Sequence, residues 1–403
     1  MFLRELELDE FRSFRTLRLP IDPAGFRAIG ANASGKSTLL EAIAMLATTR
    51  SPRTSSEREI AHWQSGQELS VPPYARLRGG FERLDGPHEI ELRLSFDPTG
   101  QAPLKKQTRF DDRPVRAVGA VGQFKTVLFG PEDVDLISGP PSGRRRYLDV
   151  AISQASRDYL RALSRYGKVL EQRNSLLRSF ARDGVGFSSP RPGQELPFWN
   201  AELAAAGVEV LATRLVAANS LSARAAKHFG SLTGDESLSL SYVSSRVSLP
   251  PLPLTFTDWR QPPTDFRQAL AAAMAHSLEV HRGEELRRGV TAVGPHRDDF
   301  VVTANGIDLG RFGSRGQQRL AVVAIKLAEL ELLEDAAGEA PVLLLDDVLS
   351  ELDAGHGQKL VALLAERRAQ ICITATEAAD LGAPALAHLP LITIRQGAVV
   401  SRD

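Results

Sequence analysis

The stretch Gly30-Ala31-Asn32-Ala33-Ser34-Gly35-Lys36-Ser37-Thr38 follows the phosphate-binding loop pattern G-x-x-x-x-G-K-[ST]. Residues 26–29 form a short run before it that can end a strand. After it, apolar residues recur at helical spacing, at Leu39, Leu40, Ile43, Ala44 and Leu46. A strand, a glycine loop and a helix in this order predict a nucleotide-binding site.

Each part of the loop has a chemical task in that prediction. Gly30 and Gly35 let the backbone wrap closely around a polyphosphate, and the loop N–H groups and the helix N-terminus supply partial positive charge. Lys36 would reach the β- and γ-phosphates of ATP, and the Ser37 hydroxyl would bind Mg²⁺, with Thr38 as a less favoured second hydroxyl. The alternative, an accidental glycine loop before a helix, does not account for a partner motif far along the chain.

That partner motif is a buried strand of four apolar residues, 342–345, followed by Asp346 and Asp347. Parallel sheets present ligand-binding groups at the C-terminal ends of their strands. Asp346 would hold Mg²⁺ through its water shell, and Asp347 would orient or deprotonate the attacking water. Taken alone, the two acids could equally be solvated caps of a strand end; the phosphate loop favours the catalytic interpretation.

The composition is that of an ordinary globular protein without a global field for nucleic acid. The 403 residues are 43% hydrophobic and 24% charged, with a formal net charge of zero, so any polyanion site must be a local patch. The length favours two or three domains. The single cysteine, Cys372, excludes a disulfide framework and suits a reducing cytoplasm. Neither a signal peptide nor a membrane span is expected.

The N-terminal residues predict an antiparallel piece beside the nucleotide-binding sheet. Residues 3–8 read as an edge strand and residues 17–19 as a second strand. Residues 75–81 and 88–96 follow as two more strands, joined at the turn Asp85-Gly86-Pro87.

The middle of the chain predicts a mainly helical lobe. A long helix starts at Arg144, a Gly/Pro/Ser-rich loop covers residues 184–197, and helices follow at 199–229 and 264–288, separated by a strand at 238–248 and a proline-rich connector at 250–263. The expected domains are therefore an ATPase lobe at 1–139, an inserted helical lobe at 140–290 and the rest of the ATPase lobe at 291–403.

After the insertion, a strand and the hairpin turn Asn305-Gly306 lead to Ser314-Arg315-Gly316-Gln317, a polar turn that opens a helix. Such a turn can offer an anion a hydroxyl, N–H groups and a helix dipole. On these four residues alone, a plain serine N-cap is the simpler interpretation. Further strands are expected at 371–374 and at 391–394, the latter as the last of the chain.

The order of phosphate loop, helical insertion, S-x-G-Q turn and aspartate strand resembles the ABC-type ATPase head. Within that class the chain resembles the RecF family of bacterial recombination mediators over nearly its whole length. The resemblance rests on Phe11-Arg12-Ser13-Phe14, the phosphate loop, Gly130-Pro131-Glu132-Asp133, Ser142-Gly143-Arg144-Arg145-Arg146-Tyr147-Leu148-Asp149, Gln172-Arg173-Asn174-Ser175-Leu176-Leu177, Gly294-Pro295-His296-Arg297-Asp298-Asp299, Ser314 with the residues to Arg319, and Leu345 with the residues to Asp353. It departs from the family at Ala33, where glycine is usual, and in the length of loop 184–197.

The resemblance implies a P-loop ABC-type head, built of a mixed sheet with helices and an antiparallel β piece, that carries an inserted mainly helical lobe. It implies that ATP and Mg²⁺ bind, that Arg12 contacts the nucleotide, and that two heads sandwich ATP, with the S-x-G-Q turn of one head on the γ-phosphate held by the other. It further implies slow hydrolysis, DNA binding at duplexes and gap junctions, and RecA loading with RecR and RecO. The implied dimer interface contains Ser314, Arg315, Gly316, Gln317 and Asp353.

One helix face offers support for DNA binding that is independent of the family. Arg157, Arg161, Arg165 and Lys168 project on one side of the helix, and like charges at i,i+4 are unfavourable by about 0.2–0.5 kcal/mol per pair. A DNA backbone would relieve this repulsion; a solvated arginine face is the alternative. His296, beside Arg297 and two aspartates, could belong to a metal cluster, but it lacks a second ligand nearby and favours a structural or subunit-contact role.

Two other classes of protein remain open at this point. An SMC-like structural ATPase head would also bind DNA, but its arm needs hundreds of residues of heptads, whereas this insertion has about 150 and is broken by prolines. An ATP-dependent nuclease would need a separate carboxylate-rich domain, and the sequence contains none.

Overall fold

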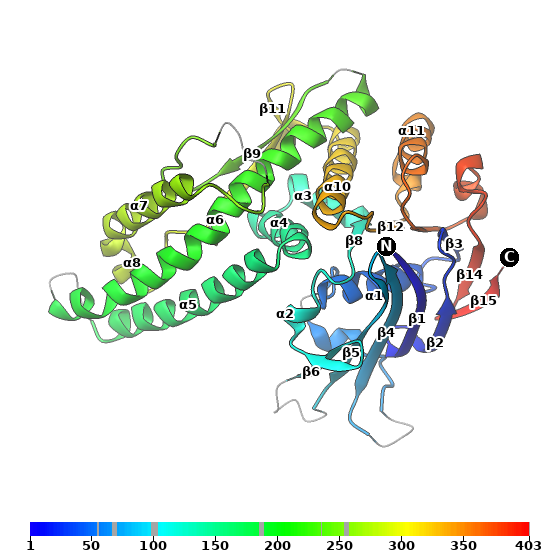
Figure 1. The fold of residues 1–403 in the computed structure, drawn as a ribbon, viewed down its shortest axis with the longest axis horizontal. Helices are drawn as coiled ribbons and strands as arrows, with labels where there is room; N and C mark the ends of the chain where they lie inside the picture. The colour runs from blue at the N-terminus through cyan, green and yellow to red at the C-terminus, as the bar shows by residue number, and fades with distance from the viewer. Residues whose placement is uncertain are drawn as a thin grey trace. The chain divides into compact units, whose positions relative to one another are not determined.

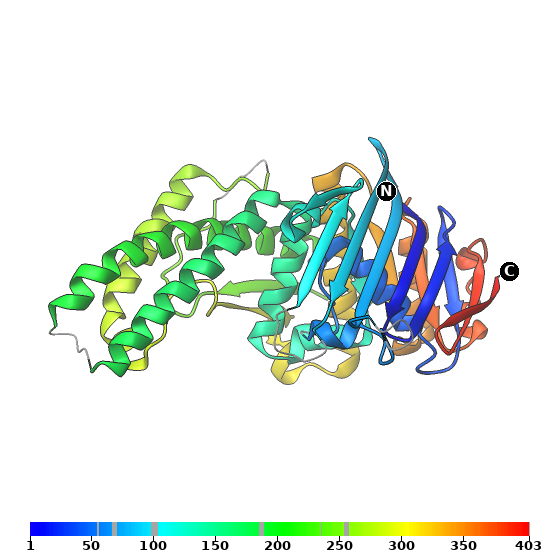
Figure 2. The ribbon, with the colours of Figure 1, turned by 90° about the horizontal axis from the view of Figure 1, so that it is seen from below.

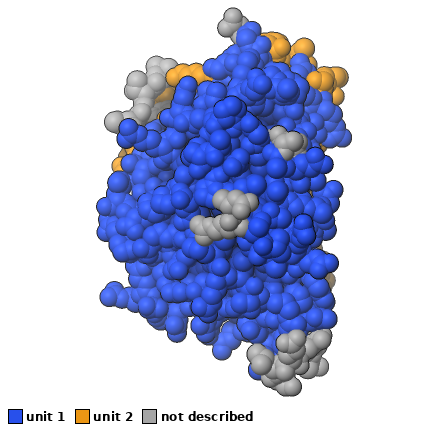
Figure 3. Space-filling model, turned by 90° about the vertical axis from the view of Figure 1, so that its right-hand side faces the viewer, with its two compact units in different colours: residues 1–134, 228–235, 315–403 blue, residues 135–227, 236–314 orange. Residues whose placement is uncertain are grey.

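The computed structural model describes residues 1–54, 56–66, 71–97, 104–184, 189–234, 236–253 and 258–402. The chain forms two compact units, coloured separately in Figure 3. Unit 1 contains residues 1–134, 228–235 and 315–403, and unit 2 contains residues 135–227 and 236–314. Compared with the expected lobes, residues 135–139 and 291–314 group with the helical unit, and residues 228–235 group with unit 1.

Unit 1 contains a six-stranded mixed sheet with strand order β15-β14-β3-β13-β12-β8. Its five strands from β14 to β8 run parallel, and β15 pairs antiparallel with β14. The strands are β3 (Gly25–Ile29), β8 (Thr126–Phe129), β12 (Val342–Asp346), β13 (Ile371–Ala375), β14 (Leu391–Arg395) and β15 (Ala398–Arg402). The prediction that residues 391–394 form the last strand is wrong, because β15 follows.

A second six-stranded sheet of unit 1 is antiparallel, in the order β2-β1-β4-β5-β6-β7 (Figure 2). Its strands are β1 (Phe2–Phe11), β2 (Phe14–Pro20), β4 (Tyr74–Arg83), β5 (Gly86–Ser95), β6 (Lys105–Phe110) and β7 (Arg113–Val115). The predicted antiparallel piece is thus present. However, β1 is not an edge strand, since it pairs with both β2 and β4.

Helix α1 (Lys36–Thr48) contacts strands of both sheets, which explains why its apolar residues are not confined to one face. Leu39, Leu40, Ile43 and Leu46 are all buried in the core that the two sheets share. The burial of α1 on both sides fixes its N-terminus against the end of β3. The remaining helical elements of unit 1 are α2 (Ala117–Ala120), α10 (Arg315–Ala337), α11 (Ala354–Ala365), η1 (Glu57–Ile60), η2 (Pro131–Val134), η3 (Leu349–Glu351), η4 (Ala378–Leu381) and η5 (Pro384–Leu386).

Unit 2 is mainly helical, as expected, with a small sheet in the order β11-β10-β9. Its helices are α3 (Asp135–Ser138), α4 (Pro141–Ala155), α5 (Arg157–Arg182), most of α6 (Pro190–Thr233), α7 (Thr264–Val280), α8 (Arg282–Arg288) and α9 (Leu309–Phe312), and its strands are β9 (Leu238–Val243), β10 (Asp299–Ala304) and β11 (Ile307–Asp308). The predicted hairpin turn Asn305-Gly306 joins β10 to β11.

Three sequence predictions in unit 2 are corrected. The long helix expected from Arg144 is two helices, because Ser156 leaves the helical conformation and its side chain caps α5 by accepting from the Tyr159 N–H. Residues 264–288 likewise divide at His281. The loop predicted for 184–197 is helical from Pro190 onward, with Pro197 inside α6, whereas residues 185–188 lie outside the described part of the chain.

Among the residues that the structure describes, no helix is long and apolar enough to cross a membrane.

Candidate nucleotide site

The phosphate loop lies where β3 ends and α1 begins, at the C-terminal edge of the parallel strands (Figure 1). Gly35 occupies the N-cap position of α1 with φ 117°, a left-handed conformation that favours glycine. No side chain of the N-cap residue accepts a hydrogen bond from the N–H groups in the first turn of α1. An anion at this point would receive both these donors and the positive end of the helix dipole.

Lys36 is buried against its own loop. Its Nζ donates to the carbonyl oxygens of Gly30 at 2.7 Å and Ala31 at 3.1 Å. These carbonyls solvate the ammonium group at the position where a β- or γ-phosphate would approach. The predicted contact of Lys36 with phosphate would replace these hydrogen bonds to loop carbonyls.

The two halves of the predicted site meet directly, although 309 residues separate them. The Ser37 hydroxyl donates to Asp346 Oδ1 at 2.9 Å, and the Thr374 hydroxyl donates to the same oxygen at 2.8 Å. Asp346 closes β12 and is 9% exposed. A hydroxyl and a carboxylate side by side are oxygen ligands of the kind that Mg²⁺ takes, together with water and substrate phosphates.

These residues fit a metal that is held partly by its substrate. Among the described residues, no group of three or more His, Cys, Asp or Glu side chains could hold a metal ion by itself. Mg²⁺ is commonly bound through one or two carboxylates plus phosphate oxygens and waters, so a pair such as Ser37 and Asp346 suffices.

Asp347 stands in a strained backbone conformation beside Asp346. Its φ of 53° is left-handed, and its N–H donates to the carbonyl and the hydroxyl of Thr374 at 3.2 and 3.1 Å. Through these hydrogen bonds to β13, the backbone at Asp347 turns away from the line of β12. Strain of this kind costs on the order of 1–3 kcal/mol and is concentrated at functional sites.

Three buried oxygens at the site have no hydrogen-bond partner within the described protein: Ser13 Oγ, Ser34 Oγ and Asp347 Oδ1. An unsatisfied buried polar atom costs about 1–3 kcal/mol, and native proteins rarely keep several of them close together. Their presence around the phosphate loop fits a site whose hydrogen bonds are completed by a bound molecule.

Arg12, expected to contact the nucleotide, forms an ion pair within unit 1. Its Nη2 donates to Oε1 of the buried Glu41 on α1 at 2.7 Å, and the Ser51 hydroxyl donates to the same oxygen at 2.5 Å. The Arg12 side chain remains 22% exposed, with a φ of 52°. A nucleotide contact by Arg12 stays a prediction, but one function of the arginine is to neutralise Glu41.

The S-x-G-Q turn lies at the start of the 23-residue helix α10, and Ser314, Arg315 and Gly316 are exposed there. Asp353, the other predicted interface residue, is the N-cap of α11. It accepts from the N–H groups of Gly355 and His356, each at 3.1 Å, and the hydrogen bond from the His356 ring lowers the pKa of its carboxyl group.

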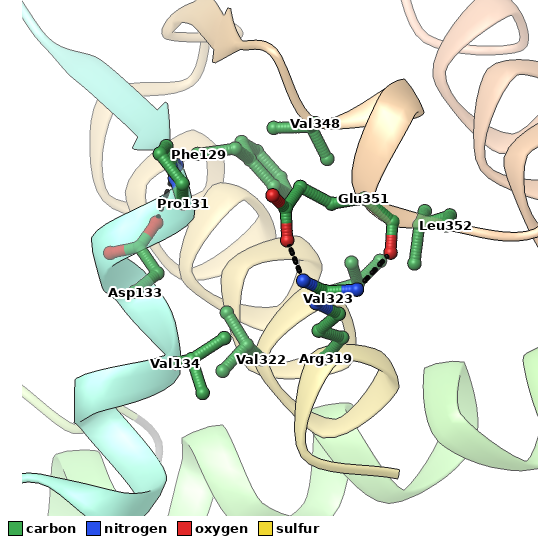
Figure 4. Close-up of a pocket in the computed structure, with 11 residues that line it drawn as sticks. Phe129, Pro131, Asp133, Val134, Arg319, Val322, Val323, Val348, Glu351 and Leu352 are labelled. Atoms are coloured by element: carbon green, nitrogen blue, oxygen red, sulfur yellow. Dashed lines mark hydrogen bonds and ion pairs between the residues drawn. The ribbon is translucent and has the colours of Figure 1, made fainter. Parts of the chain in front are cut away.

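The start of α10 is tied to the segment after β12 by a contact that sequence reasoning missed (Figure 4). Arg319 donates from Nη1 to the Glu351 carbonyl at 2.8 Å and forms an ion pair with the Glu351 carboxylate. The pair covers a small pocket between β8, η2, α10 and η3, which Val322, Val348 and Leu352 help to line. In the sequence, this contact is indicated only by an arginine five residues after Ser314 and a glutamate four residues after Asp347. Neither spacing is specific for an ion pair.

The strings that carried the family resemblance in unit 2 meet in a buried polar network. Arg214, 3% exposed, donates to the Asp149 carboxylate at 2.7 and 3.0 Å and to the Pro295 carbonyl at 2.7 Å. Asp298 accepts from the hydroxyl groups of Tyr242 and Ser244, each at 3.0 Å. Paired in this way, buried charges stabilise one arrangement of the helices instead of forming a reactive site.

His296 belongs to this network. The Tyr166 hydroxyl lies 2.6 Å from its Nδ1, and its Nε2 lies 3.1 Å from the Thr291 carbonyl. Burial lowers the pKa of His296 to about 4, so the ring is neutral at pH 7. The contacts are those of the structural role that the sequence favoured.

The predicted DNA face lies on α5. Arg157, Arg161, Arg165 and Lys168 are all exposed, as expected. Arg161 pairs with Asp158 at 3.2 Å and Arg165 with Glu202 at 2.7 Å, so carboxylates neutralise half of the face. Among the described residues, Arg157 and Lys168 have no ion-pair partner.

Comparison with known proteins gives one consistent result. The sequence model of the RecF/RecN/SMC N-terminal domain matches residues 2–384. The DNA replication and repair protein RecF of Thermomicrobium roseum is 44% identical over 398 residues, which cover 98% of this chain and 99% of that protein. RecF of Chloroflexus aurantiacus is 42% identical over 411 residues and 99% of both chains.

The solved structures agree. A structure of the recombination mediator protein RecF with ATP in the RecFOR pathway has a TM-score of 0.81 and 30% identity, covering 100% of this chain and 97% of that one. The Smc head domain of Pyrococcus furiosus has a TM-score of 0.51 at 16% identity, a likeness of fold alone.

We expect Lys36→Ala to weaken ATP binding by about 100-fold, because removing one partner of a charged contact costs about 2–5 kcal/mol and each 1.4 kcal/mol is tenfold. Titration calorimetry measures the effect. Lys359→Ala is the matched control, since that ammonium also donates to a carbonyl, of Leu232 at 2.7 Å, and lies outside the loop. Unchanged ATP affinity in a folded Lys36→Ala protein would contradict the assignment of the loop.

We expect Ala33→Gly to raise the free energy of unfolding by about 1 kcal/mol, because Ala33 has a φ of 61° and an L-residue in that conformation is strained by roughly this amount. Chemical denaturation measures it. Ala31→Gly, in the same loop but outside the left-handed region, should give no such gain. Equal effects of the two substitutions would show that the Ala33 backbone is not strained.

Proposed function

The chain belongs to the RecF family of DNA replication and repair proteins, and on this premise we propose that it is an ATP-dependent DNA-binding recombination mediator. ATP would close two copies into a dimer, slow hydrolysis stimulated by DNA would open it, and the dimer would act with RecR and RecO in loading RecA at gaps. The observation that carries the proposal is the direct contact between Ser37 and Asp346, which brings the two motifs predicted to bind ATP and Mg²⁺ together in one chain while Ser314 stays exposed.

Each residue of the site has a proposed task. The loop from Gly30 to Thr38 would hold the phosphates through its N–H groups, and Lys36 would neutralise charge on the β- and γ-phosphates. Ser37 and Asp346 would hold Mg²⁺, which when bound would neutralise negative charge on the phosphates. Asp347 would position the attacking water, since its strained backbone turns the carboxylate away from the strand and one carboxylate oxygen lacks a partner within the described protein.

The proposed dimer is a sandwich in which the Ser314-Arg315-Gly316-Gln317 turn of one copy binds the γ-phosphate held by the other. Support comes from the exposure of the turn at the start of a long helix, where N–H groups and the dipole favour an anion. Arg319 would keep this turn in register with the segment from Asp347 to Asp353 of its own chain.

An SMC-like structural head is the weaker alternative. The Smc likeness is limited to the fold, whereas the RecF likeness extends over nearly the whole chain at 44% identity. Helix α5 has 26 residues and α6 has 44, which is far less than an arm of hundreds of residues requires.

We expect Ser314→Arg to leave ATP binding by the monomer nearly normal and to weaken ATP-dependent dimerisation by about tenfold or more, about 1.4 kcal/mol, because the bulky side chain would occupy the place of the partner's γ-phosphate. Sedimentation with a non-hydrolysable ATP analogue, paired with a nucleotide titration, separates the two effects.

Ser239→Arg is the control, because Ser239 is an exposed serine on β9. A Ser314→Arg protein that still dimerises on ATP would reject the role in trans. Loss of ATP affinity by the monomer would place the turn at its own chain's site.

For DNA, we expect Arg157→Glu with Lys168→Glu to weaken duplex binding and to lower the slope of log K against log salt by about 0.9 for each phosphate that is no longer neutralised. Fluorescence anisotropy over a salt series measures both. Lys105→Glu with Arg113→Glu makes the same change of charge on exposed residues of β6 and β7. An identical response of the two double variants would mean that α5 does not contact DNA.

A further inference from the structure

The C-terminal β-hairpin reaches the phosphate loop from outside the nucleotide-binding motif. Its strands β14 and β15 are joined by Gln396 and Gly397, whose φ values of 48° and 71° are both left-handed, as in the tight turns that suit the twist of a hairpin. Because β14 runs parallel to β3 and pairs with it, the turn emerges at the sheet edge where the phosphate loop begins (Figure 1).

The hairpin contacts the loop at two points. The Gly397 N–H donates to the Ser34 carbonyl at 2.9 Å, in the middle of the loop. At its start, a side chain on Gly30 would place its Cβ 2.3 Å from the Ile394 carbonyl oxygen, so β14 and the loop backbone are in close contact there.

The turn between β1 and β2 completes the support. A Cβ on Gly397 would lie 1.9 Å from the Ser13 carbonyl oxygen, and a Cβ on Gly35 would lie 3.1 Å from Ser13 Oγ and 3.2 Å from the Phe14 ring. Ser13 is thus in contact with both the hairpin turn and the end of the phosphate loop. The loop is held between two turns that belong to neither the loop nor α1.

Such contact is not a general property of hairpin turns in this chain. The turn Asn305-Gly306 has the same left-handed pattern, with φ values of 50° and 78°, yet a Cβ on Gly306 would meet nothing within 4 Å. At Gly306, only the left-handed backbone conformation favours glycine. At Gly397, glycine is favoured by the backbone conformation and also by the close approach of the Ser13 backbone.

We propose that the Gln396-Gly397 turn is a positioning element of the nucleotide site, which holds the phosphate loop in the shape that presents its N–H groups to a nucleoside polyphosphate. The identity of this ligand rests on the proposed function. The loop's own sequence leaves it free to move, since it contains two glycines and has no side-chain cap on α1. The bond from the Gly397 N–H fixes the Ser34 carbonyl, and with it the peptide unit in the middle of the loop.

The test compares Gly397→Ala with Gly306→Ala. Both substitutions place a side chain in a left-handed turn, but only at Gly397 would the added Cβ collide with a neighbour, the Ser13 backbone, and so push the turn away from the position in which its N–H donates to the Ser34 carbonyl. We expect Gly397→Ala to weaken ATP and ADP binding by about tenfold or more in titration calorimetry, because the loss of one hydrogen bond to a charged phosphate lowers affinity by about this factor. Hydrogen exchange of peptides covering residues 30–38 should become faster without nucleotide.

In Gly306→Ala both readouts should match the unsubstituted protein, and the ATP-induced rise in melting temperature should persist. Normal ATP affinity of Gly397→Ala, or an equal loss in both variants, would overturn the proposal.

A second variant avoids a collision that could unfold the sheet. One glycine inserted between Gln396 and Gly397 moves the turn without adding a side chain, and it should reproduce the loss of ATP affinity while the melting temperature without nucleotide stays close to normal. Normal ATP affinity of the insertion variant would overturn the positioning role. Lys36→Ala separates this result from the proposed function: if that variant retains ATP affinity, the loop is not the ATP site, whatever Gly397→Ala does.

Discussion

The parallel pairing of β3, β13 and β12 is the constraint on which the site depends. These strands come from residues 25–29, 371–375 and 342–346. Their register brings the hydroxyl groups of Ser37 and Thr374 to the same carboxylate oxygen of Asp346. Parallel strands end at the same sheet edge, so groups that follow them in sequence become neighbours in space. The chain can leave unit 1 after residue 134, pass through it again at residues 228–235 and return at residue 315, because the sheet, and not chain continuity, holds the two halves together.

Features that depend on local chemistry could be predicted from the sequence, and features that depend on distant partners could not. The phosphate loop and the strand before Asp346 are patterns of adjacent residues, and both lie where the sequence predicts them. The break at Ser156 depends on one serine capping α5 in a run whose apolar spacing continues unbroken. Helix α6 contains Pro197, although proline removes a backbone hydrogen bond and therefore predicts a helix boundary. The Arg319–Glu351 pair joins residues 32 positions apart, so no local pattern indicates it. Strand β15 was missed although it pairs with the adjacent β14 across a two-residue turn.

Buried polar and charged side chains have different roles in the two units. Arg173 is fully buried, donates to Glu285 at 2.5 Å and Thr291 at 2.8 Å, and with Arg214 stabilises the interior of unit 2. Removing one partner of such a pair costs about 3–5 kcal/mol, whereas a hydrophobic replacement of the whole pair can be neutral. These charges therefore specify which helices pack together. In unit 1 the important polar groups are those left incomplete, such as Asp347 Oδ1 and Ser34 Oγ.

A loop with an alanine at φ 61° can persist because neighbouring elements hold its backbone in place. A loop that determined its own shape would avoid that strain, which glycine would remove. Here the shape is set from outside, by the β1–β2 turn, the C-terminal hairpin and the ion pair of Arg12 with Glu41 on α1. A similar path continues past the aspartates: the Ser350 hydroxyl donates to the Asp347 carbonyl at 2.8 Å, and Glu351 is bound by Arg319 of α10. Contacts of side chains and backbone thus connect the segment that follows Asp347 to the start of α10.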